Sequence, residues 1–162
     1  MIEQIKNFIV LSDLLWCGGM PTAAQVHGLA QRGVQLVINL AIPDSEGALK
    51  DEAALVRSLA MEYVSIPVRW DSPKAGDLES FSDVMDRNAG KRILVHCQAN
   101  YRATAFIALY RIRRLGWAPD KAFKSLRSVW NPDEYPAWKQ FVEDQMRGHT
   151  GGRSASVPTA RS

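Results

Sequence analysis

Residues 92–102 read Arg92-Ile93-Leu94-Val95-His96-Cys97-Gln98-Ala99-Asn100-Tyr101-Arg102, and this stretch decides the fold. Its first half is a short apolar run that predicts a buried strand, and a nearly all-apolar helix is expected from Arg102 to Leu115. A strand, a tight turn and a helix place Cys97 at a helix N-terminus, where free backbone N–H groups and the helix dipole attract anions. The stretch therefore predicts an anion-binding turn that carries a thiol.

The residue types in this turn suit nucleophilic chemistry on an oxyanion. The field of a helix N-terminus lowers a thiol pKa, so Cys97 is expected to be a thiolate near neutral pH. Arg102 adds a planar fork of donors that fits phosphate oxygens, and His96 is expected to hold the loop by hydrogen bonding. The backbone donors expected to bind phosphate belong to Gln98, Ala99, Asn100, Tyr101 and Arg102. The alternative is a buried, inert cysteine at a strand end.

Working outward, short β-branched runs alternate with helical patterns along the chain. We expect strands at residues 8–11, 14–17, 34–40, 63–68 and 92–95, and helices at 23–31, 46–61, 78–87, 102–115, from 119 and from 132 to 146. Strands separated by helices predict an α/β fold with a central, mainly parallel sheet of four to five strands flanked by helices. Ligands of such sheets bind beyond the carboxyl ends of the strands, where Cys97 lies.

Length and charge point to one domain without a nucleic-acid partner. The chain has 162 residues, which suits a single domain over residues 1–147. Residues 148–162 are small, polar and aperiodic, and predict a disordered C-terminal tail. Two of the three net positive charges come from that tail, which leaves residues 1–147 nearly neutral. The net charge therefore does not indicate a basic patch for nucleic acid.

Cysteine usage and hydropathy indicate a cytoplasmic protein. The only cysteines are Cys17 and Cys97, which excludes a disulfide framework and favours a reducing compartment. No signal peptide and no apolar run long enough to span a membrane are recognised. No metal-ligand spacing occurs, so we expect neither a metal nor an organic cofactor. Cys17 is either a core residue or a partner that pairs with Cys97 under oxidation.

Several stretches resemble the dual-specificity branch of the protein tyrosine phosphatase superfamily. They are Gly33–Leu40, Met61–Val68 and Ile93–Cys97, while Val95–Arg102 is similar in particular to a bacterial group of phosphatase-family proteins. The resemblance implies a dual-specificity-phosphatase-like fold and a phosphocysteine intermediate on Cys97. It also implies that Arg102 holds the phosphate and that a mobile loop supplies an aspartic general acid.

The chain departs from the superfamily pattern within the loop. One residue fewer separates Cys97 from Arg102, and Asn100 stands where the family has glycine; asparagine tolerates a left-handed backbone better than other non-glycine residues. The family's hydroxyl after the arginine is replaced by Ala103. Either Thr104, one place later, reaches in to help the cysteine leave, or turnover is slow. Tyr101 either lines the pocket wall or packs beneath it.

Two aspartates are candidates for the general acid. The family places this residue just past the strand that ends at Val68, and here Trp70 occupies the expected position and Asp71 follows it. Asp71 is the first choice, and its alternative role is that of a turn residue. Asp77 is the second candidate, although it is also placed to cap the next helix.

The expected function is hydrolysis of phosphate monoesters of the phosphotyrosine type, on a phosphorylated protein or a small phosphate ester, and the oligomeric state is left open. One alternative is a rhodanese-like sulfurtransferase, because the short Cys97-to-Arg102 loop has the length found in rhodaneses. The other is a catalytically weak phosphate-binding module, which Ala103 would favour. The expectation remains a phosphatase because the upstream strands resemble phosphatases.

Overall fold

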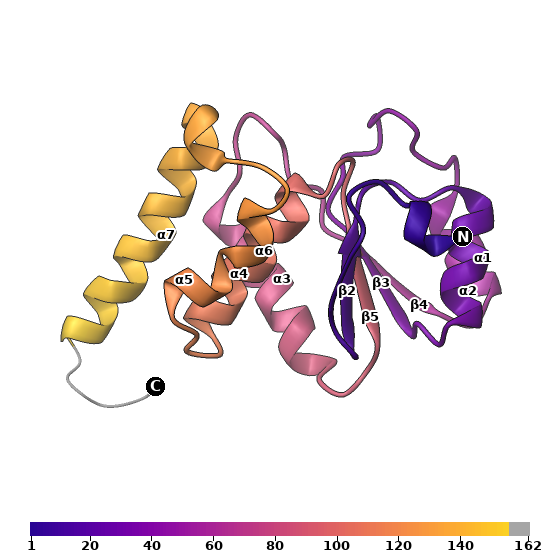
Figure 1. Ribbon diagram of the computed structural model, residues 1–162, viewed down its shortest axis with the longest axis horizontal. Helices are drawn as coiled ribbons and strands as arrows, with labels where there is room; N and C mark the ends of the chain where they lie inside the picture. The colour runs from indigo at the N-terminus through magenta and orange to yellow at the C-terminus, as the bar shows by residue number, and fades with distance from the viewer. Residues whose placement is uncertain (156–162) are drawn as a thin grey trace.

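The computed structural model describes residues 1–155, with side chains to residue 148, and its centre is a five-stranded sheet of order β1-β2-β5-β3-β4 (Figure 1). The strands are β1 (Ile9–Ser12), β2 (Leu15–Gly18), β3 (Leu36–Asn39), β4 (Glu62–Ser65) and β5 (Ile93–His96). β1 and β2 form an antiparallel hairpin at one edge, and every other pairing is parallel. The predicted α/β fold with a mainly parallel sheet is confirmed.

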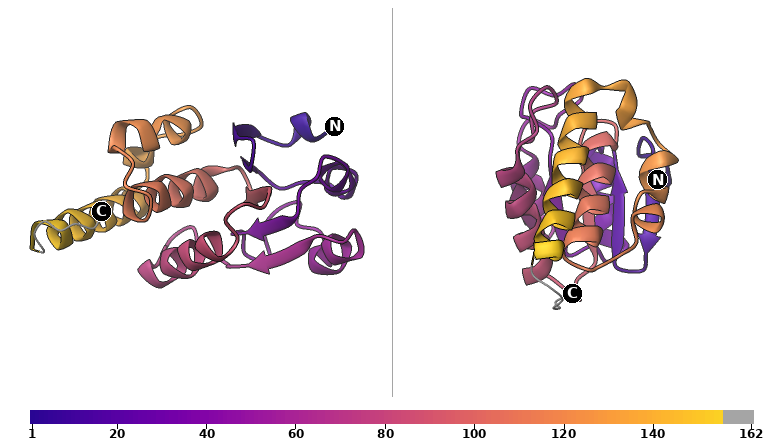
Figure 2. Two further views of the ribbon diagram at one scale, coloured as in Figure 1. Left: turned by 90° about the horizontal axis from the view of Figure 1, so that it is seen from below. Right: turned by 90° about the vertical axis from the view of Figure 1, so that its left-hand side faces the viewer.

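Helices cover both faces of this sheet. They are η1 (Ile2–Gln4), α1 (Ala23–Gln31), α2 (Glu52–Ser58), α3 (Ala75–Arg87), α4 (Tyr101–Arg113), α5 (Pro119–Ala122), α6 (Lys124–Arg127), η2 (Pro132–Glu134) and α7 (Pro136–Ala155). α1 and α2 lie on one face, and α3 and α4 lie on the other (Figure 1). α7 runs along the outer side of α4, so the second face carries two helical layers (Figure 2).

Alternation along the strands divides the core between the two faces. In β3, Leu36 and Ile38 pack with the α3 and α4 side, whereas Val37 packs with α1 and α2. In β5, Val95 packs with the α3 and α4 side, and Leu94 packs with α1 and α2. Strands buried on both faces read as continuous apolar runs, which is why these two were recognised in the sequence.

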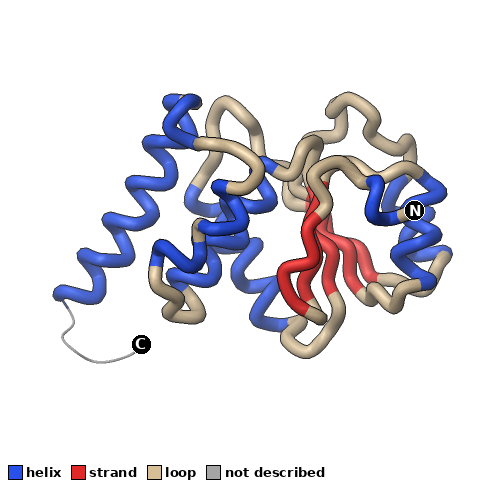
Figure 3. The backbone as a smooth tube through the Cα atoms, in the orientation of Figure 1, coloured by secondary structure: helices blue, strands red, loops and turns tan. Residues whose placement is uncertain are grey.

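The carboxyl ends of β2, β5 and β3 lie at the same end of the sheet, because these strands are parallel. Loops connect strands and helices at both ends of the sheet (Figure 3). Gly18 of β2 and Asn39 of β3 both align with His96 of β5 in the parallel register. The chain leaves β5 at His96 and enters α4 at Tyr101. Residues 96–101 thus place the Cys97 turn beyond the carboxyl ends of the parallel strands, where ligands of such sheets bind.

The helix expected over residues 102–115 is shifted by one or two residues, to Tyr101–Arg113, and three other predicted helices differ more from their bounds in the structure. The helix expected over residues 46–61 covers only Glu52–Ser58, because Gly47 has a left-handed backbone with φ of 79° and Asp51 caps the helix start. The helix expected from residue 78 begins at Ala75, one polar turn earlier. The stretch from residue 132 divides into η2 and α7, because Pro136 opens a new helix.

The predicted tail from residue 148 lies only partly within the described residues. The backbone of α7 is helical as far as Ala155, so the prediction of disorder does not match residues 148–155. Residues 156–162 lie outside the described residues. Within the described part of the chain, no helix is long and apolar enough to cross a membrane.

Candidate active site

The Cys97–Arg102 loop turns sharply because one of its residues has a left-handed backbone. Asn100 has φ of 69° and ψ of 14° and is the N-cap of α4, which confirms the expectation for this position. The amides of Gln98, Ala99, Tyr101 and Arg102 donate no hydrogen bond to another part of the described chain. Amides of this kind, gathered at a helix N-terminus, are suited to binding an anion.

The carbonyl side of the loop is held by two neighbouring segments. The amide of Met20 donates to the Gln98 carbonyl (3.0 Å), and the Asn7 side chain donates to the Ala99 carbonyl (3.0 Å). In return, the Asn100 side chain donates to the Asn7 carbonyl (2.7 Å). Because neighbours engage the carbonyls, the backbone of this turn is fixed without using the amides of Gln98, Ala99, Tyr101 and Arg102.

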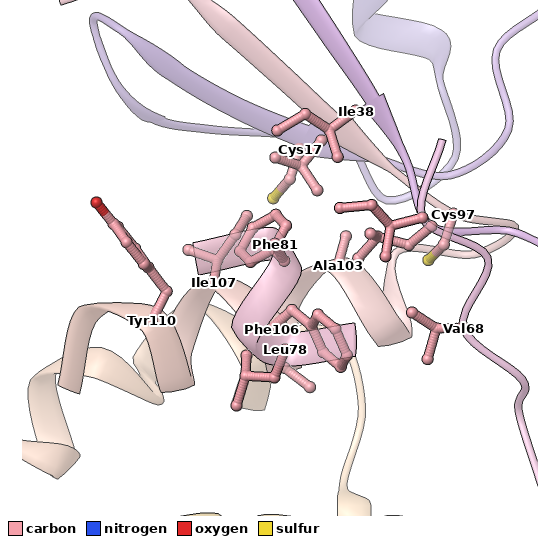
Figure 4. Close-up of a cluster of buried hydrophobic side chains, with 14 of the residues drawn as sticks. Cys17, Ile38, Val68, Leu78, Phe81, Cys97, Ala103, Phe106, Ile107 and Tyr110 are labelled. Atoms are coloured by element: carbon pink, nitrogen blue, oxygen red, sulfur yellow. The ribbon is translucent and has the colours of Figure 1, made fainter. Parts of the chain in front are cut away.

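Both cysteines are buried, and they occupy different environments. Cys97 is 0% exposed, its amide donates to the Gly18 carbonyl (3.3 Å), and its sulfur lies near Val68 at the margin of the core (Figure 4). Cys17 is also 0% exposed and lies in β2, level with Val95. Burial raises the pKa of Cys17 to about 12, so its thiol stays protonated. Cys17 is therefore a core residue in this structure.

Arg102 connects the loop to the segment after β4. It is 6% exposed, and its Nη1 atom donates to the Val68 carbonyl at 2.7 Å. The start of α4 is thereby joined to residues 66–74, the segment that carries Asp71 and leads into the helix that carries Asp77. A guanidinium held by one carbonyl keeps further N–H donors for an oxyanion.

Five aromatic rings from the start of α4, the segment after β4 and the chain from residue 130 to α7 pack together, and we refer to them as the aromatic cluster. They are Trp70, Tyr101, Trp130, Tyr135 and Trp138. Tyr101 is partly buried and stacks on Trp130 with ring centroids 4.8 Å apart. The indole N–H of Trp138 donates to the Trp70 carbonyl (2.7 Å), so the chain just before Asp71 is fixed to α7.

The two candidate acids both lie in the connection from β4 to the first turn of α3. The Asp71 carboxylate is exposed, pairs with Arg69 (3.3 Å) and accepts a hydrogen bond from Ser72 (3.3 Å). The expected capping role of Asp77 is wrong: Lys74 is the N-cap of α3, and Asp77 lies inside the first turn. Burial raises the pKa of Asp77.

Thr104 has partners other than the cysteine sulfur. Its hydroxyl lies 2.7 Å from the Asn100 carbonyl and 2.9 Å from the Tyr101 carbonyl, and it accepts a hydrogen bond from the Trp130 indole (3.0 Å). A hydroxyl has a single hydrogen to donate, and here a loop carbonyl takes it. Thr104 thus links the aromatic cluster to the loop backbone, while Ala103 is fully buried.

A buried polar network beneath Cys97 contains a residue that the sequence did not single out. His96 Nδ1 lies 3.1 Å from the Cys97 carbonyl oxygen, and His96 Nε2 lies 2.6 Å from Glu52 Oε2. Asn39 donates to Glu52 Oε1 (3.3 Å) and to the Tyr63 hydroxyl (3.1 Å). Glu52 is 44 positions from His96 and opens a different helix, so no local pattern marked it. Among the described residues, no group of three potential metal ligands occurs.

Comparison with known proteins matches most of this chain to one family. A family model described as DSP-PTPase phosphatase fused to NAD+ kinase covers residues 9–144. A crystal structure of a DUF442 protein from Shewanella putrefaciens CN-32, described as a candidate phosphatase, has 36% identity and a TM-score of 0.83, and the match covers 91% of this chain and 96% of the other. No functionally curated protein matches the chain.

More distant structures share the fold alone. TpbA from P. aeruginosa in complex with phosphotyrosine has 19% identity and a TM-score of 0.67, covering 89% of this chain and 90% of TpbA. PTPMT1 in complex with PI(5)P has 18% identity and a TM-score of 0.67, covering 86% of this chain and 96% of PTPMT1.

Proposed function

We propose that this chain, which belongs to the DSP-PTPase phosphatase family, hydrolyses phosphate monoesters through a phosphocysteine intermediate on Cys97. One observation carries the proposal. Cys97, Arg102 and a set of backbone amides without acceptors in the described chain belong to a single turn between the central strand and a buried helix. A nucleophile beside a preorganised set of oxyanion donors is the arrangement that phosphoryl transfer requires.

The residues of the site account for two chemical steps. In the first, the Cys97 thiolate forms a bond to phosphorus while the ester P–O bond breaks, and the leaving oxygen takes a proton from Asp71. The amides of residues 98–102 and the Arg102 guanidinium stabilise the equatorial oxygens. In the second, Asp71 takes a proton from water, the water oxygen bonds to phosphorus, and the S–P bond breaks to return the thiolate. No metal or organic cofactor enters either step.

Substrate entry requires a rearrangement of the segment after β4. Cys97 is fully buried, and Arg102 donates to the Val68 carbonyl. In the proposed reaction a phosphate oxygen replaces that carbonyl as the partner of the guanidinium, and residues 66–74 move away from the loop. The phosphate then supplies a stronger, charged acceptor for the same donor.

An aryl phosphate is the proposed reference substrate, because the aromatic cluster contributes partly buried rings that include Tyr101, the neighbour of Arg102 in the chain. The phosphotyrosine complex of TpbA supports an aryl ester, and the PI(5)P complex of PTPMT1 supports a wider range of phosphate monoesters. The family description also names fusion to NAD+ kinase, so phosphorylated nicotinamide nucleotides belong in the substrate panel.

The proposal is tested with p-nitrophenyl phosphate and two proteins, the wild type and Cys97→Ser. We expect release of nitrophenol by the wild type, none by the variant, and equal thermal stability of the two. Equal hydrolysis by both would refute the cysteine mechanism. Transfer of sulfur from thiosulfate to cyanide in place of hydrolysis would establish the sulfurtransferase. Calorimetric binding of inorganic phosphate without any hydrolysis would establish a binding module.

A further inference from the structure

The protonation of the imidazole behind Cys97 is constrained by its two neighbours. The Cys97 carbonyl oxygen, 3.1 Å from His96 Nδ1, can only accept, so Nδ1 carries a hydrogen. The other ring nitrogen lies 2.6 Å from Glu52 Oε2, so a single proton is shared along that contact. With Glu52 ionised, His96 is an imidazolium; with Glu52 protonated, His96 is neutral.

The surroundings of Glu52 hold its carboxyl group from both sides. His96 is 0% exposed and Glu52 is 6% exposed, so neither side chain can satisfy its polar atoms with bulk water, and each depends on its contact with the other. The second carboxylate oxygen of Glu52 accepts from the Asn39 amide (3.3 Å), which donates and so stabilises negative charge. Asn39 is fixed in this orientation because its own oxygen accepts from the Ala41 amide (2.8 Å).

Three separate elements bring this network to the nucleophile. Asn39 and His96 are register partners at the carboxyl ends of β3 and β5. Glu52 is the first residue of α2, and the side chain of Asp51 fixes that helix start by accepting from the Ala54 amide (3.2 Å). Glu52 touches neither Cys97 nor the proposed phosphate position, so its contact with the reaction passes through His96.

We propose that Glu52 is a positioning residue for Cys97: acting through His96, its carboxylate keeps the imidazole charged and oriented, and thereby sets the pH range in which the thiolate forms. This inference rests on the proposed function of Cys97. An imidazolium hydrogen-bonded to the backbone of the nucleophile favours the thiolate, because an opposite charge nearby stabilises the ionised form.

Other charged and titratable groups on the elements around the pair are few. Tyr63 and Arg57 lie on the β4 and α2 side, and Cys97 and Arg102 lie on the loop side. Burial raises the pKa of Tyr63, so its hydroxyl stays protonated. Glu52 is therefore the carboxylate in direct contact with His96 within the described chain.

The experiment measures alkylation of Cys97 by iodoacetamide against pH, with the labelled peptide identified by mass spectrometry. The proteins are the wild type, Glu52→Gln, Glu52→Asp and Glu46→Gln, an exposed residue of the preceding loop. Glutamine keeps the size of Glu52, removes the charge and retains one of the two acceptor oxygens, the other being replaced by an NH2 donor. We expect Glu52→Gln to move the half-maximal pH upward by about one unit, Glu52→Asp to move it less, and Glu46→Gln to leave it unchanged.

Each outcome separates this proposal from the proposed function. One outcome would overturn the role of Glu52 alone: the wild type has a half-maximal pH of alkylation below that of an ordinary thiol, and Glu52→Gln has the same half-maximal pH. Profiles of both proteins in the ordinary thiol range would contradict the thiolate mechanism as well. If Glu52→Gln fails to fold, nitrogen NMR of His96 in the wild type decides: protonation of both ring nitrogens at neutral pH is expected, and a neutral ring would overturn the proposal.

Discussion

The two halves of the Cys97–Arg102 loop rest on different kinds of support. Beneath its start, His96, Glu52 and Asn39 form a small buried network of hydrogen bonds with one carboxylate and one imidazole. Beside its end, Tyr101 belongs to the aromatic cluster, which is held by stacking and by two indole hydrogen bonds. We call the first group, with His96, Glu52 and Asn39, the polar half, and the aromatic cluster the aromatic half. The polar half contributes charge and orients the loop, whereas the aromatic half contributes buried apolar surface.

This difference separates reactivity from placement. A change in the polar half is expected to alter the pH dependence of Cys97 with little effect on the position of Arg102. A change in the aromatic half is expected to alter stability and the positions of Arg102 and Asp71, while the charge near the sulfur stays the same. The variants below test this division, beginning with the largest expected effect.

Asp71→Asn tests whether the aromatic half delivers the general acid. Because Trp70 is fixed by Trp138, we expect Asp71 to be placed reproducibly, and its loss to lower kcat for an aryl phosphate by about 10²- to 10⁴-fold. The acid-side limb of the pH–rate profile should flatten. Asp77→Asn is the matched control, and a larger rate loss in that variant would transfer the acid role to Asp77.

Trp138→Ala removes the largest fully buried side chain of the aromatic half. We expect a loss of about 3–5 kcal/mol in the free energy of unfolding, measured by urea denaturation, because a large cavity remains and Trp70 loses its donor. Among molecules that stay folded, the pH profile of Cys97 alkylation should match the wild type. A shifted profile would show that the two halves are not independent.

Asn100→Ala and Asn100→Gly separate backbone conformation from side-chain bonding at the centre of the loop. Both variants lose the hydrogen bond to the Asn7 carbonyl, and only alanine is strained at φ of 69°. We expect Asn100→Ala to be less stable than Asn100→Gly by about 1–2 kcal/mol in thermal or urea unfolding. Equal stability would mean that the turn adopts another conformation.

Asp77→Asn should have the smallest effect, and it depends on pH. Burial raises the pKa of Asp77 above the ordinary value of 3.8, so folding favours the protonated carboxyl. That stabilisation is complete below pH 3.8 and is lost as the pH rises through the higher folded-state pKa. The variant should equal the wild type in acid and exceed it near neutral pH by less than about 0.5 kcal/mol. If Asp77→Asn is less stable than the wild type at neutral pH, the predicted direction of this effect is wrong.

Local signals explain what the sequence could predict. The strand–turn–helix around Cys97 and the left-handed Asn100 depend on neighbouring residues, and so does the helix capped by Thr22, which forms a capping box with Gln25. The expected helix over residues 46–61 was too long because apolar periodicity outweighed Gly47, whose backbone ends any helix there.

Long-range contacts explain what the sequence did not predict. Glu52 reaches His96 from a helix 44 positions earlier, and the donation from Arg102 to Val68 joins segments 34 positions apart. Trp70 and Trp138 meet only because α7 packs along α4. Neither the periodicity nor the spacing of these residues contains that information, since both describe one element at a time.

Trapping of the covalent intermediate tests the central claim most directly. Wild-type protein is mixed with an aryl phosphate, quenched in acid within the first turnover and digested for mass spectrometry. The account predicts a burst of released phenol and one phosphoryl group on the peptide that contains Cys97. Hydrolysis that continues with no phosphoryl group on this peptide, or with the group on another residue, would contradict it.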